Sequence, residues 1–479
     1  MVAEMFNIPL LIVILYIFAL FGISFYASKR AKGTEGFLLA GRQMTTPLIA
    51  VLITGLAIGG ASTIGVAEQA YNVGLAAGWY NVAWGAGAIC MGILAAAKYR
   101  SMNITTVPEM FEKFYDVKGR VICVLSQITI QLVITSLQYL AGGAILASLL
   151  PSVFTLQSGI ITSAIVFIGI TFVGGMWSAG ISNILNVVLI YLGIAAATIA
   201  TLINQGGIAQ IAVKLPQEVP YFHWVGGLGW IAIASWFAVM MTQTMSLQGT
   251  VQISLSAKDA KTARNGFVIG GLLMLPIGFL AALMGIAAKG MYPDMSATLA
   301  LPQMIMSLPP VLAGITLAAL WAADVSTAGS LLLGSATLFS QDIYKRFLRP
   351  GSDEKHLMWV TKFSVIALGA LTFILALTVS GILKTIMIGL SLTTAFTIVF
   401  LFTVFAPGLA RRNSAFYTNL VGIAVIVLWQ FIPAVRVFPH VIYLEWIACL
   451  VTFLLVPIFD RQPIRLGNKE DSLISQVAK

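Results

Sequence analysis

The sequence predicts an all-α polytopic membrane protein, and two observations carry this prediction. Hydrophobic residues make up 59% of the 479 positions and charged residues only 9%, whereas soluble domains carry about 25% charged residues. Apolar runs of about 18 residues or more, which are long enough to cross a bilayer, recur along the whole chain. The net charge of +10 does not indicate a nucleic-acid partner, because the basic residues gather in short loops.

Thirteen such runs can be counted, and no loop between them is long enough for a soluble domain. The first run has no basic segment ahead of it, so a retained helix is expected and not a signal peptide. The predicted transmembrane helices cover approximately residues 7–28, 46–73, 76–98, 120–150, 157–176, 181–203, 226–250, 265–288, 307–340, 358–379, 383–406, 413–433 and 440–459.

The basic residues predict the orientation of these helices. When the runs are threaded alternately through a membrane, only Lys214, Lys289, Lys384 and Arg436 fall on one side, and the other Lys and Arg residues fall on the opposite side. Because short cytoplasmic loops are enriched in Lys and Arg, we expect a multi-pass plasma-membrane protein with its N-terminus outside and its C-terminus in the cytoplasm.

The ninth run carries a face of small and hydroxyl side chains. Ala323, Ser326, Thr327 and Ser330 are spaced i, i+3, i+4 and i+7, so they share one side of a helix. Such a face suits close helix packing, because small residues let backbones approach. It also suits a hard cation, which prefers oxygen ligands. The spacing alone leaves both interpretations open.

The second and seventh runs are predicted to be interrupted. Residues 53–68 hold Gly55, Gly59, Gly60 and Gly65, and each glycine disfavours a helix by about 1 kcal/mol relative to alanine. The seventh run, 226–250, begins glycine-rich and ends in polar residues. Interrupted helices at matching positions of two halves indicate an inverted-repeat transporter with its site at the breaks. Tight packing around the glycines is the alternative.

Several short motifs, in order along the chain, resemble the sodium:solute symporter family. They are residues 60–65 (GASTIG), 174–179 (GGMWSA), 251–252 with 256–258, 323–327 with 342–345, and 411–413. The resemblance implies a ten-helix inverted-repeat (5+5, LeuT-like) core with one leading and two trailing helices. The expected units are a leading helix and loop (1–45), two five-helix repeats (46–204 and 205–410), two accessory helices (411–460) and a cytoplasmic tail (461–479).

The resemblance also implies a function and an ion site. It implies sodium-coupled symport of a small organic solute by alternating access, with no organic cofactor and with the monomer as the functional unit. The sodium ligands carried over by position are the backbone carbonyls of Ala61, Ile64 and Ala323 and the hydroxyls of Ser326 and Thr327. This set agrees with the cation interpretation of the ninth run.

Two departures from the family pattern change the expectation. Where some relatives have a Thr-Asp pair that helps to bind a second sodium, this chain has Ser182 and Asn183, and Gly329 replaces a hydroxyl near Ser330. We therefore expect one sodium ion. Asp324 is an acid in a place where an apolar residue is usual, and no Lys or Arg lies inside a core span to pair with it.

Three roles for Asp324 follow from the cost of a buried charge in a membrane. It is a counter-charge near the sodium ion, a proton-carrying group, or a protonated hydrogen-bond donor. The second role is the basis of an alternative function, a proton-coupled or uncoupled carrier on the same fold, for example for an amine-bearing solute.

The resemblance places the solute beside the sodium ion, between the second and seventh runs. For the aromatic and methionine candidates, core packing is the plainer interpretation. Glu68 is an acid in an apolar setting and is functional by default, unless it is solvated at the outer mouth of its helix. The candidates are Gly65, Glu68, Gln69, Tyr80, Asn81, Trp84, Gln131, Gln138, Trp236, Met240, Gln243, Thr244, Ser391 and Thr394.

Other classes of protein are disfavoured by what the sequence contains. The three histidines, His223, His356 and His440, lie at the ends of loops or runs, and no nucleophile–base or metal cluster falls within a run, so an enzyme is not expected. A channel would show filter-like repeats or rings of charge, and a membrane sensor would carry a signalling domain.

Overall fold

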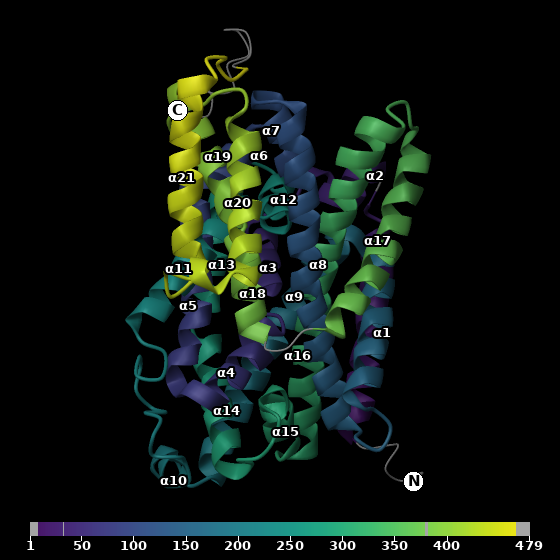
Figure 1. The fold of residues 1–479 in the computed structure, drawn as a ribbon. Helices are drawn as coiled ribbons and strands as arrows, with labels where there is room; N and C mark the ends of the chain where they lie inside the picture. The colour runs from purple at the N-terminus through teal and green to yellow at the C-terminus, as the bar shows by residue number, and fades with distance from the viewer. Residues whose placement is uncertain (1–7, 32, 379–381, 466–479) are drawn as a thin grey trace.

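The described part of the chain is a bundle of helices (Figure 1). The structure is a computed structural model that describes residues 8–31, 33–378 and 382–465. Within these residues there is no β-strand, and two isolated bridges pair Met44 with Ala257 and Arg411 with Pro463. The all-α prediction is therefore confirmed for this part of the chain.

The helices follow one another with short connections, and η marks a 3₁₀- or π-helical segment. The first half contains α1 (Ile8–Ser28), α2 (Gly33–Leu39), η1 (Ala40–Arg42), α3 (Thr46–Ala57), η2 (Ala61–Gly65), α4 (Val66–Val73), η3 (Gly74–Gly78), α5 (Trp79–Met91), η4 (Gly92–Ala96), α6 (Ala97–Ser101), α7 (Val107–Phe114), α8 (Val117–Leu149), α9 (Leu156–Asn204) and α10 (Ile208–Val213). The second half contains α11 (Trp230–Ser246), α12 (Gln248–Ser256), α13 (Ala260–Met274), α14 (Ile277–Met291), η5 (Ala297–Leu299), α15 (Ala300–Met306), α16 (Pro310–Thr337), η6 (Leu338–Leu348), α17 (Glu354–Ala376), α18 (Ile382–Ser391), α19 (Thr393–Phe405), η7 (Pro407–Leu409), α20 (Ser414–Phe431), η8 (Pro433–Val435) and α21 (Val441–Phe459).

Ten helical stretches of the described residues are long and apolar enough to cross a membrane, or eleven if the bent pair α11–α12 is one span. The sequence predicts more because some neighbouring runs are joined in the structure. The helix α9 has 49 residues, which would measure about 70 Å if straight, over twice the roughly 30 Å hydrocarbon core. It is broken at Gly175, whose φ of 58° is left-handed. Gly74, with φ of 79°, similarly separates α4 from α5.

The second and seventh predicted runs are both interrupted, but the seventh bends at Leu247 and not at its glycine-rich start, which precedes α11. The helix α3 ends at Ala57, and the chain continues as the π-helical turn η2 before α4. The helix α11 ends at Ser246, and α12 leaves it at an angle of 51°. At the first break η2 contacts α8, and at the second break α12 contacts α16. The helix α16 is central, because 83% of the apolar stretch that it carries is buried, against 22% of the corresponding stretch of α1.

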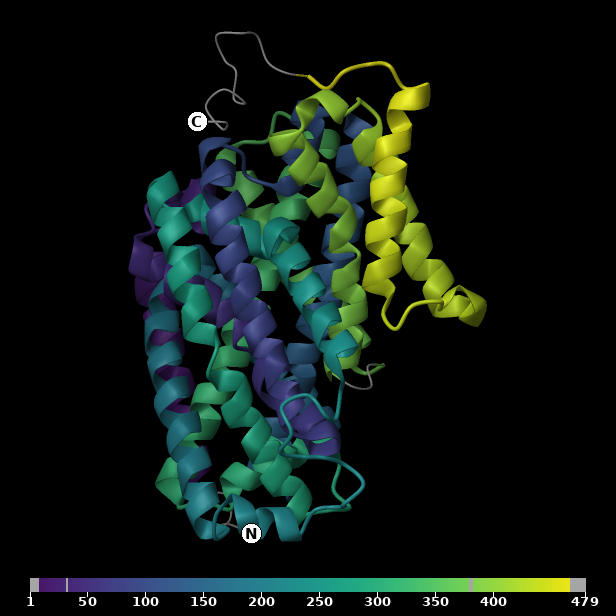
Figure 2. The ribbon, with the colours of Figure 1, turned by 90° about the vertical axis from the view of Figure 1, so that its left-hand side faces the viewer.

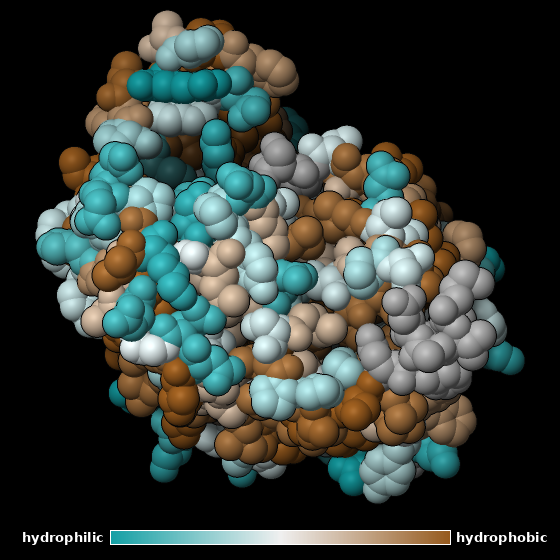
Figure 3. All heavy atoms as spheres, turned by 90° about the horizontal axis from the view of Figure 1, so that it is seen from below, coloured by the Kyte–Doolittle hydropathy of each residue, from teal (hydrophilic) through white to brown (hydrophobic). Residues whose placement is uncertain are grey.

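The remaining helices define two ends and one edge of the bundle. The helices α2, α6 and α7 lie at the upper end in Figure 1, and α10, α14 and α15 lie at the lower end. Polar side chains gather over the lower end, and hydrophobic ones dominate its flanks (Figure 3). The pair α20–α21 stands at one edge (Figure 2) and packs against α19.

Candidate ion and solute site

Thr327 on α16 lies directly against the break in the second predicted span. Its hydroxyl donates to the backbone carbonyls of Gly55 and Leu56, at 3.0 and 3.1 Å. A methyl group on Gly59 would come within 2.3 Å of Thr327 Oγ1, so the glycine is what allows this approach. Because a hydroxyl that donates its hydrogen still has two lone pairs, Thr327 keeps the capacity to bind a cation.

Ser326, the neighbouring hydroxyl, is held by an asparagine of α9. Its Oγ donates to Asn183 Oδ1 at 2.5 Å, and both side chains are buried. A methyl group on Gly55 would lie 2.3 Å from Asn183 Nδ2, so Asn183 fills the space between α3 and α16. The two hydroxyls of the predicted sodium set are thus fixed from two different helices.

The other predicted sodium ligands lie on the same two segments. Ala61 and Ile64 belong to η2, in which the amide of Gly65 donates to the carbonyl of Gly60 at 2.7 Å, five residues back. This π-turn shifts carbonyls out of the α-helical pairing, and such turns are frequent at functional sites. Ala61, Ile64 and Ala323 are all buried. The structure therefore brings together the two segments that carry the predicted set.

Asp324, three positions before Thr327 on α16, lies beside the same break. It is fully buried, and a methyl group on Gly60 would be 3.1 Å from Asp324 Oδ1. The amide of Gly60 donates to Gln138 Oε1 at 2.7 Å. Neither carboxylate oxygen of Asp324 has a hydrogen-bond partner among the described residues. A buried carboxylate in this state requires a proton or a nearby cation, which agrees with each of the three expected roles.

The other candidates for ion coupling are divided. Asn183 contacts Ser326 as described, whereas the hydroxyl of Ser182 donates to the carbonyl of Ser178 at 2.8 Å. Ser182 lines a small cavity together with Ser326. Ser330 is buried, and its hydroxyl has no hydrogen-bond partner among the described residues.

Four of the predicted solute residues surround one cavity with two of the predicted sodium residues. Tyr80, Trp84, Gln138 and Gln243 line it, and so do Ala61 and Thr327. Two polar atoms of this wall, Tyr80 Oη and Gln243 Oε1, are buried and find no hydrogen-bond partner in the described part of the chain. The cavity has a free volume of about 20 Å³, which is enough for a water molecule but not for a solute. The site is therefore closed in this structure.

A wider hollow lies where α11 and α18 begin. Gln69 and Trp236 line it, together with Lys384 and His440, and its volume is about 360 Å³. The ring of Trp236 meets the ring of Tyr80 edge-on at 6.0 Å. Since Tyr80 lines the inner cavity, this aromatic pair separates the cavity from the hollow.

Glu68 and Gly65 lie near this partition and contact α18. Glu68 Oε2 accepts from the amide of Ile382 at 3.5 Å. A methyl group on Gly65 would lie 2.8 Å from the side chain of Ile382. Gly65, the last residue of η2, and Glu68 on α4 therefore pack the second span against the start of α18.

The remaining solute candidates do not line the cavity. The hydroxyl of Thr244 donates to the carbonyl of Gly87 at 2.8 Å, and Asn81 is packed beside Gly278. Their side chains therefore connect helices. Met240, Gln131, Ser391 and Thr394 are buried away from the cavity wall. The apolar lining includes Ile134, Leu331, Ile386 and Leu390, and nothing in the sequence distinguishes these residues from core positions.

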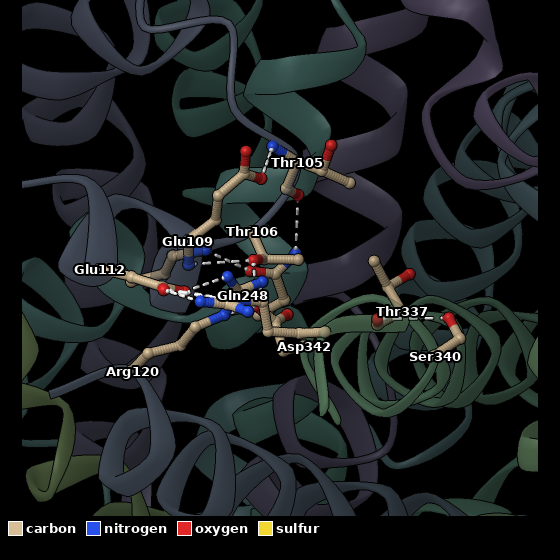
Figure 4. Close-up of polar contacts among 11 residues, drawn as sticks. Thr105, Thr106, Glu109, Glu112, Arg120, Gln248, Thr337, Ser340 and Asp342 are labelled. Atoms are coloured by element: carbon tan, nitrogen blue, oxygen red, sulfur yellow. Dashed lines mark hydrogen bonds and ion pairs between the residues drawn. The ribbon is translucent and has the colours of Figure 1, made fainter. Parts of the chain in front are cut away.

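A cluster of ion pairs at the upper end was not predicted from the sequence. Arg120 on α8 pairs with Asp342 on η6 at 2.6 Å and with Glu112 on α7 at 2.5 Å (Figure 4). Glu112 also pairs with Arg346 at 2.6 Å. The hydrogen bond to Arg346 is the largest contribution that lowers the pKa of Glu112 to about 2. Because 222 residues separate Arg120 from Asp342, no local pattern could reveal the pair.

The cluster and its neighbours join α7 to η6 and to α12 at the upper end. Thr106 donates to Asp342 Oδ1 at 2.9 Å, and the amide of Val107 donates to Gln248 Oε1 at 2.9 Å. Gln248 is the first residue of α12, directly after the break in the seventh span. The ion pairs and the helix break are thus connected through α7 (Figure 4).

Interrupted helices that meet at a buried polar site are the architecture of secondary transporters. The model of the sodium:solute symporter family matches residues 37–422. This is most of the chain, and the chain belongs to the sodium:solute symporter family. It is accordingly a sodium-coupled transporter of a small organic solute and not an enzyme.

Known relatives are similar over most of their length. A sodium/glucose cotransporter of Vibrio parahaemolyticus is 25% identical over 415 residues, which cover 78% of this chain and 76% of the relative. The high-affinity proline transporter PutP of Bacillus subtilis is 23% identical over 430 residues, covering 85% and 89%. The solved structure of a Na⁺-coupled sialic acid symporter, in a substrate-bound outward-open state, has a TM-score of 0.79 at 20% identity and covers 96% of this chain and 99% of its own. This last likeness concerns the fold.

Proposed function

We propose that the chain binds one sodium ion at the hydroxyls of Ser326 and Thr327 on α16, beside the break between α3 and η2, and carries it inward with a small organic solute. The observation that carries the proposal is that both hydroxyls donate to fixed oxygens, of Asn183 and of Gly55 and Leu56. Their lone pairs are thereby left for a cation, and the carbonyls of Ala61, Ile64 and Ala323 complete an oxygen set that suits sodium.

The predicted topology of thirteen spans is part of the proposal. It is supported by the breaks at Gly74 and Gly175, which divide long helical stretches into pairs of membrane-length helices. The division into a leading helix, two five-helix repeats, two accessory helices and a tail follows the same boundaries as the sequence predicts. The upper end, with α7 and its ion pairs, is then cytoplasmic, and the monomer is the working unit in the lipid bilayer.

The solute is proposed to bind in an enlarged form of the cavity between η2 and α11. Gln138, Gln243 and Tyr80 offer amide and hydroxyl groups there, and Trp84 offers an aromatic surface. The cavity lining holds no Lys or Arg, and Asp324 lies close by. These features favour a solute with an amine or several hydroxyls. Relatives named for glucose, proline and pantothenate supply the first compounds to test.

Alternating access would open the two sides in turn. The contact of Tyr80 with Trp236 closes the outer side, and the ion pairs of Glu112, Arg120 and Asp342 close the inner side. Sodium can shift the equilibrium between these states only by its difference in affinity for them. A sodium ion held by both η2 and α16 would lose ligands if these two segments separate on opening. Its affinity for the two states would then differ.

The function is tested with purified protein in liposomes. Radiolabelled proline, glucose and pantothenate are offered under an inward sodium gradient, and potassium replaces sodium in the control. We expect one of these or a related solute to accumulate only with the sodium gradient. Accumulation that follows a proton gradient without sodium would instead support the proton-coupled alternative through Asp324.

A further inference from the structure

A chain of hydrogen bonds connects the leading helix α1 to the proposed sodium site. Tyr16 on α1 donates its hydroxyl to Asn186 Oδ1 at 2.7 Å. Asn186 Nδ2 in turn donates to Asn183 Oδ1 at 3.3 Å. The same Asn183 oxygen accepts the hydroxyl of Ser326 at 2.5 Å. The chain thus passes from α1 through α9 to α16.

The Tyr16 hydroxyl determines which way the Asn186 amide faces. An amide has one oxygen that accepts and one nitrogen that donates. When Tyr16 donates to the oxygen, the nitrogen is directed at Asn183 and at the carbonyl of Ala322, 3.4 Å away. Asn186 therefore donates to the residue before the predicted ligand Ala323 and to the residue that holds Ser326. A reversed amide would lose these contacts.

The side chains of this hydrogen-bond chain are shielded from water and lipid. Tyr16 is 9% exposed, Asn186 2%, Asn183 0% and Ser326 6%, although only six of the 21 residues of α1 are buried. Inside a membrane an unsatisfied polar group costs several kcal/mol, so each bond of the chain restrains the next side chain. Apolar residues alone would serve α1 if it only covered the bundle.

A second polar contact joins α1 to the same region. Ser178 on α9 donates to Ser24 on α1 at 2.6 Å, next to the break at Gly175. The helix α1 packs against both α9 and α16. Two hydroxyls of α1 therefore point to the part of α9 that carries Asn183 and Asn186.

We infer that the leading helix, which lies outside the ten-helix core, belongs to the ion-binding machinery, with Tyr16 as a positioning residue for the Ser326 hydroxyl through Asn186 and Asn183. The inference rests on the proposed sodium site. Outer contacts that orient ion ligands change metal affinity by about 10–100-fold when they are removed. Tyr16 should accordingly affect sodium affinity without touching the ion or the solute.

The test measures thermal unfolding of the purified protein against sodium concentration, with potassium keeping the ionic strength constant. For Tyr16→Phe we expect the sodium concentration that gives half of the stabilisation to rise about tenfold. Tyr99→Phe is the matched control, because the hydroxyl of Tyr99 is buried and has no hydrogen-bond partner within the described residues. Its half-stabilising concentration should equal that of the wild type.

A second variant tests the chain at its next member. Asn186→Leu has a similar shape and should also weaken sodium binding. The double variant should bind no more weakly than Asn186→Leu alone, because the two residues act in one chain. Asn186→Leu also carries the test if Tyr16→Phe does not fold.

The outcomes separate this inference from the proposed function. If Tyr16→Phe only lowers the unfolding temperature equally in sodium and potassium, its role is structural and the inference is overturned. The same holds if the effects of the two substitutions simply add. If the wild type itself shows no sodium-selective stabilisation, the sodium site fails and the inference fails with it.

Discussion

At the scale of single residues, the site is organised by which hydrogen each polar group has already donated. Ser326 and Thr327 point their hydrogens at protein oxygens, and Gln138 accepts the amide of Gly60, which the helix break leaves without a helical partner. Because these hydrogens are already donated, the polar groups at the site present acceptor lone pairs that can face a cation. Asp324, whose carboxylate has no hydrogen-bond partner among the described residues, adds an acid beside Gly60 of the same break.

Gln138→Leu tests the contact that satisfies the broken backbone. The substitution leaves the buried Gly60 amide without its acceptor, which should destabilise the protein by about 1–3 kcal/mol. Gln131→Leu on the same helix is the control, since Gln131 Oε1 has no partner among the residues that the structure describes and the hydrogen bond from Gln131 Nε2 to the carbonyl of Gln127 is long, at 3.4 Å. Thermal unfolding measures both variants. Equal losses would contradict the assigned role of Gln138.

Residue-level prediction is strongest where spacing along one helix is enough. The hydroxyl face of α16 follows from i, i+3 and i+4 positions, and the structure places Thr327 against the carbonyls of Gly55 and Leu56 at the helix break, whereas Ser326 contacts Asn183 of α9. Prediction is weaker where the answer depends on the rotation of a helix against its neighbours. Thr244 and Asn81 sit on the expected helices, but they face other helices, and no local pattern encodes that rotation.

At the scale of helices, the glycines of the second span are required by close approach. A methyl group on Gly60 would lie 2.3 Å from the Cβ of Ala141. Gly60→Ala should therefore push η2 away from α8, lower the unfolding temperature and reduce stabilisation by sodium. Gly22→Ala on α1 is the control, because nothing lies within 4 Å of its added methyl group, and alanine favours a helix by up to about 1 kcal/mol. Similar losses for both variants would disprove the steric argument.

The ion cluster of α7 predicts a pH dependence. Because Arg346 and Arg120 lower the pKa of Glu112 from 4.5 to about 2, Glu112 stabilises the folded state above the unfolded pKa. This contribution is lost as the pH falls from about 4.5 towards about 2. The unfolding temperature of the wild type should therefore fall more steeply below about pH 5 than that of Glu112→Gln.

Glu109→Gln is the matched control for this pH dependence. Glu109 lies on the same helix and makes no ion pair within the described residues. Its variant should keep the slope of the wild type. A Glu112→Gln protein with an unchanged slope would mean that the ion pairs do not contribute in solution.

Element boundaries were predictable only in part. Glycine content indicated the break in the second run, because glycine weakens a helix, whereas the glycines at 226–229 of the seventh run precede α11 and its bend lies at Leu247. The π-turn at η2 and the 51° bend at Leu247 are set by contacts with α16 and α8, which arise only on folding. The ion cluster joins segments far apart in the chain and escaped prediction for the same reason.

At the scale of the whole molecule, the lengths of the apolar runs predicted an all-helical membrane bundle. They could do so because the thickness of a membrane sets the length of each helix separately, without reference to the rest of the fold.

The orientation can be tested with single cysteines on exposed sites, in a background in which Cys90 is replaced. Lys355→Cys, in the first turn of α17, and Gln217→Cys, in the loop after α10, lie on sides that are predicted to be opposite. In intact cells, an impermeant maleimide should label Gln217→Cys only. Labelling of Lys355→Cys only would show that the orientation is the reverse of the predicted one.

The central claim is that Ser326 and Thr327 bind sodium against the broken second span. Its most direct test is the thermal unfolding of the wild type and of the double variant Ser326→Ala/Thr327→Ala, in sodium and in potassium at equal ionic strength. A ligand that binds only the folded state stabilises it in a saturable way. The wild type should show a saturable, sodium-selective rise in unfolding temperature that the double variant lacks. An equal rise in both proteins, or none in either, would contradict the claim.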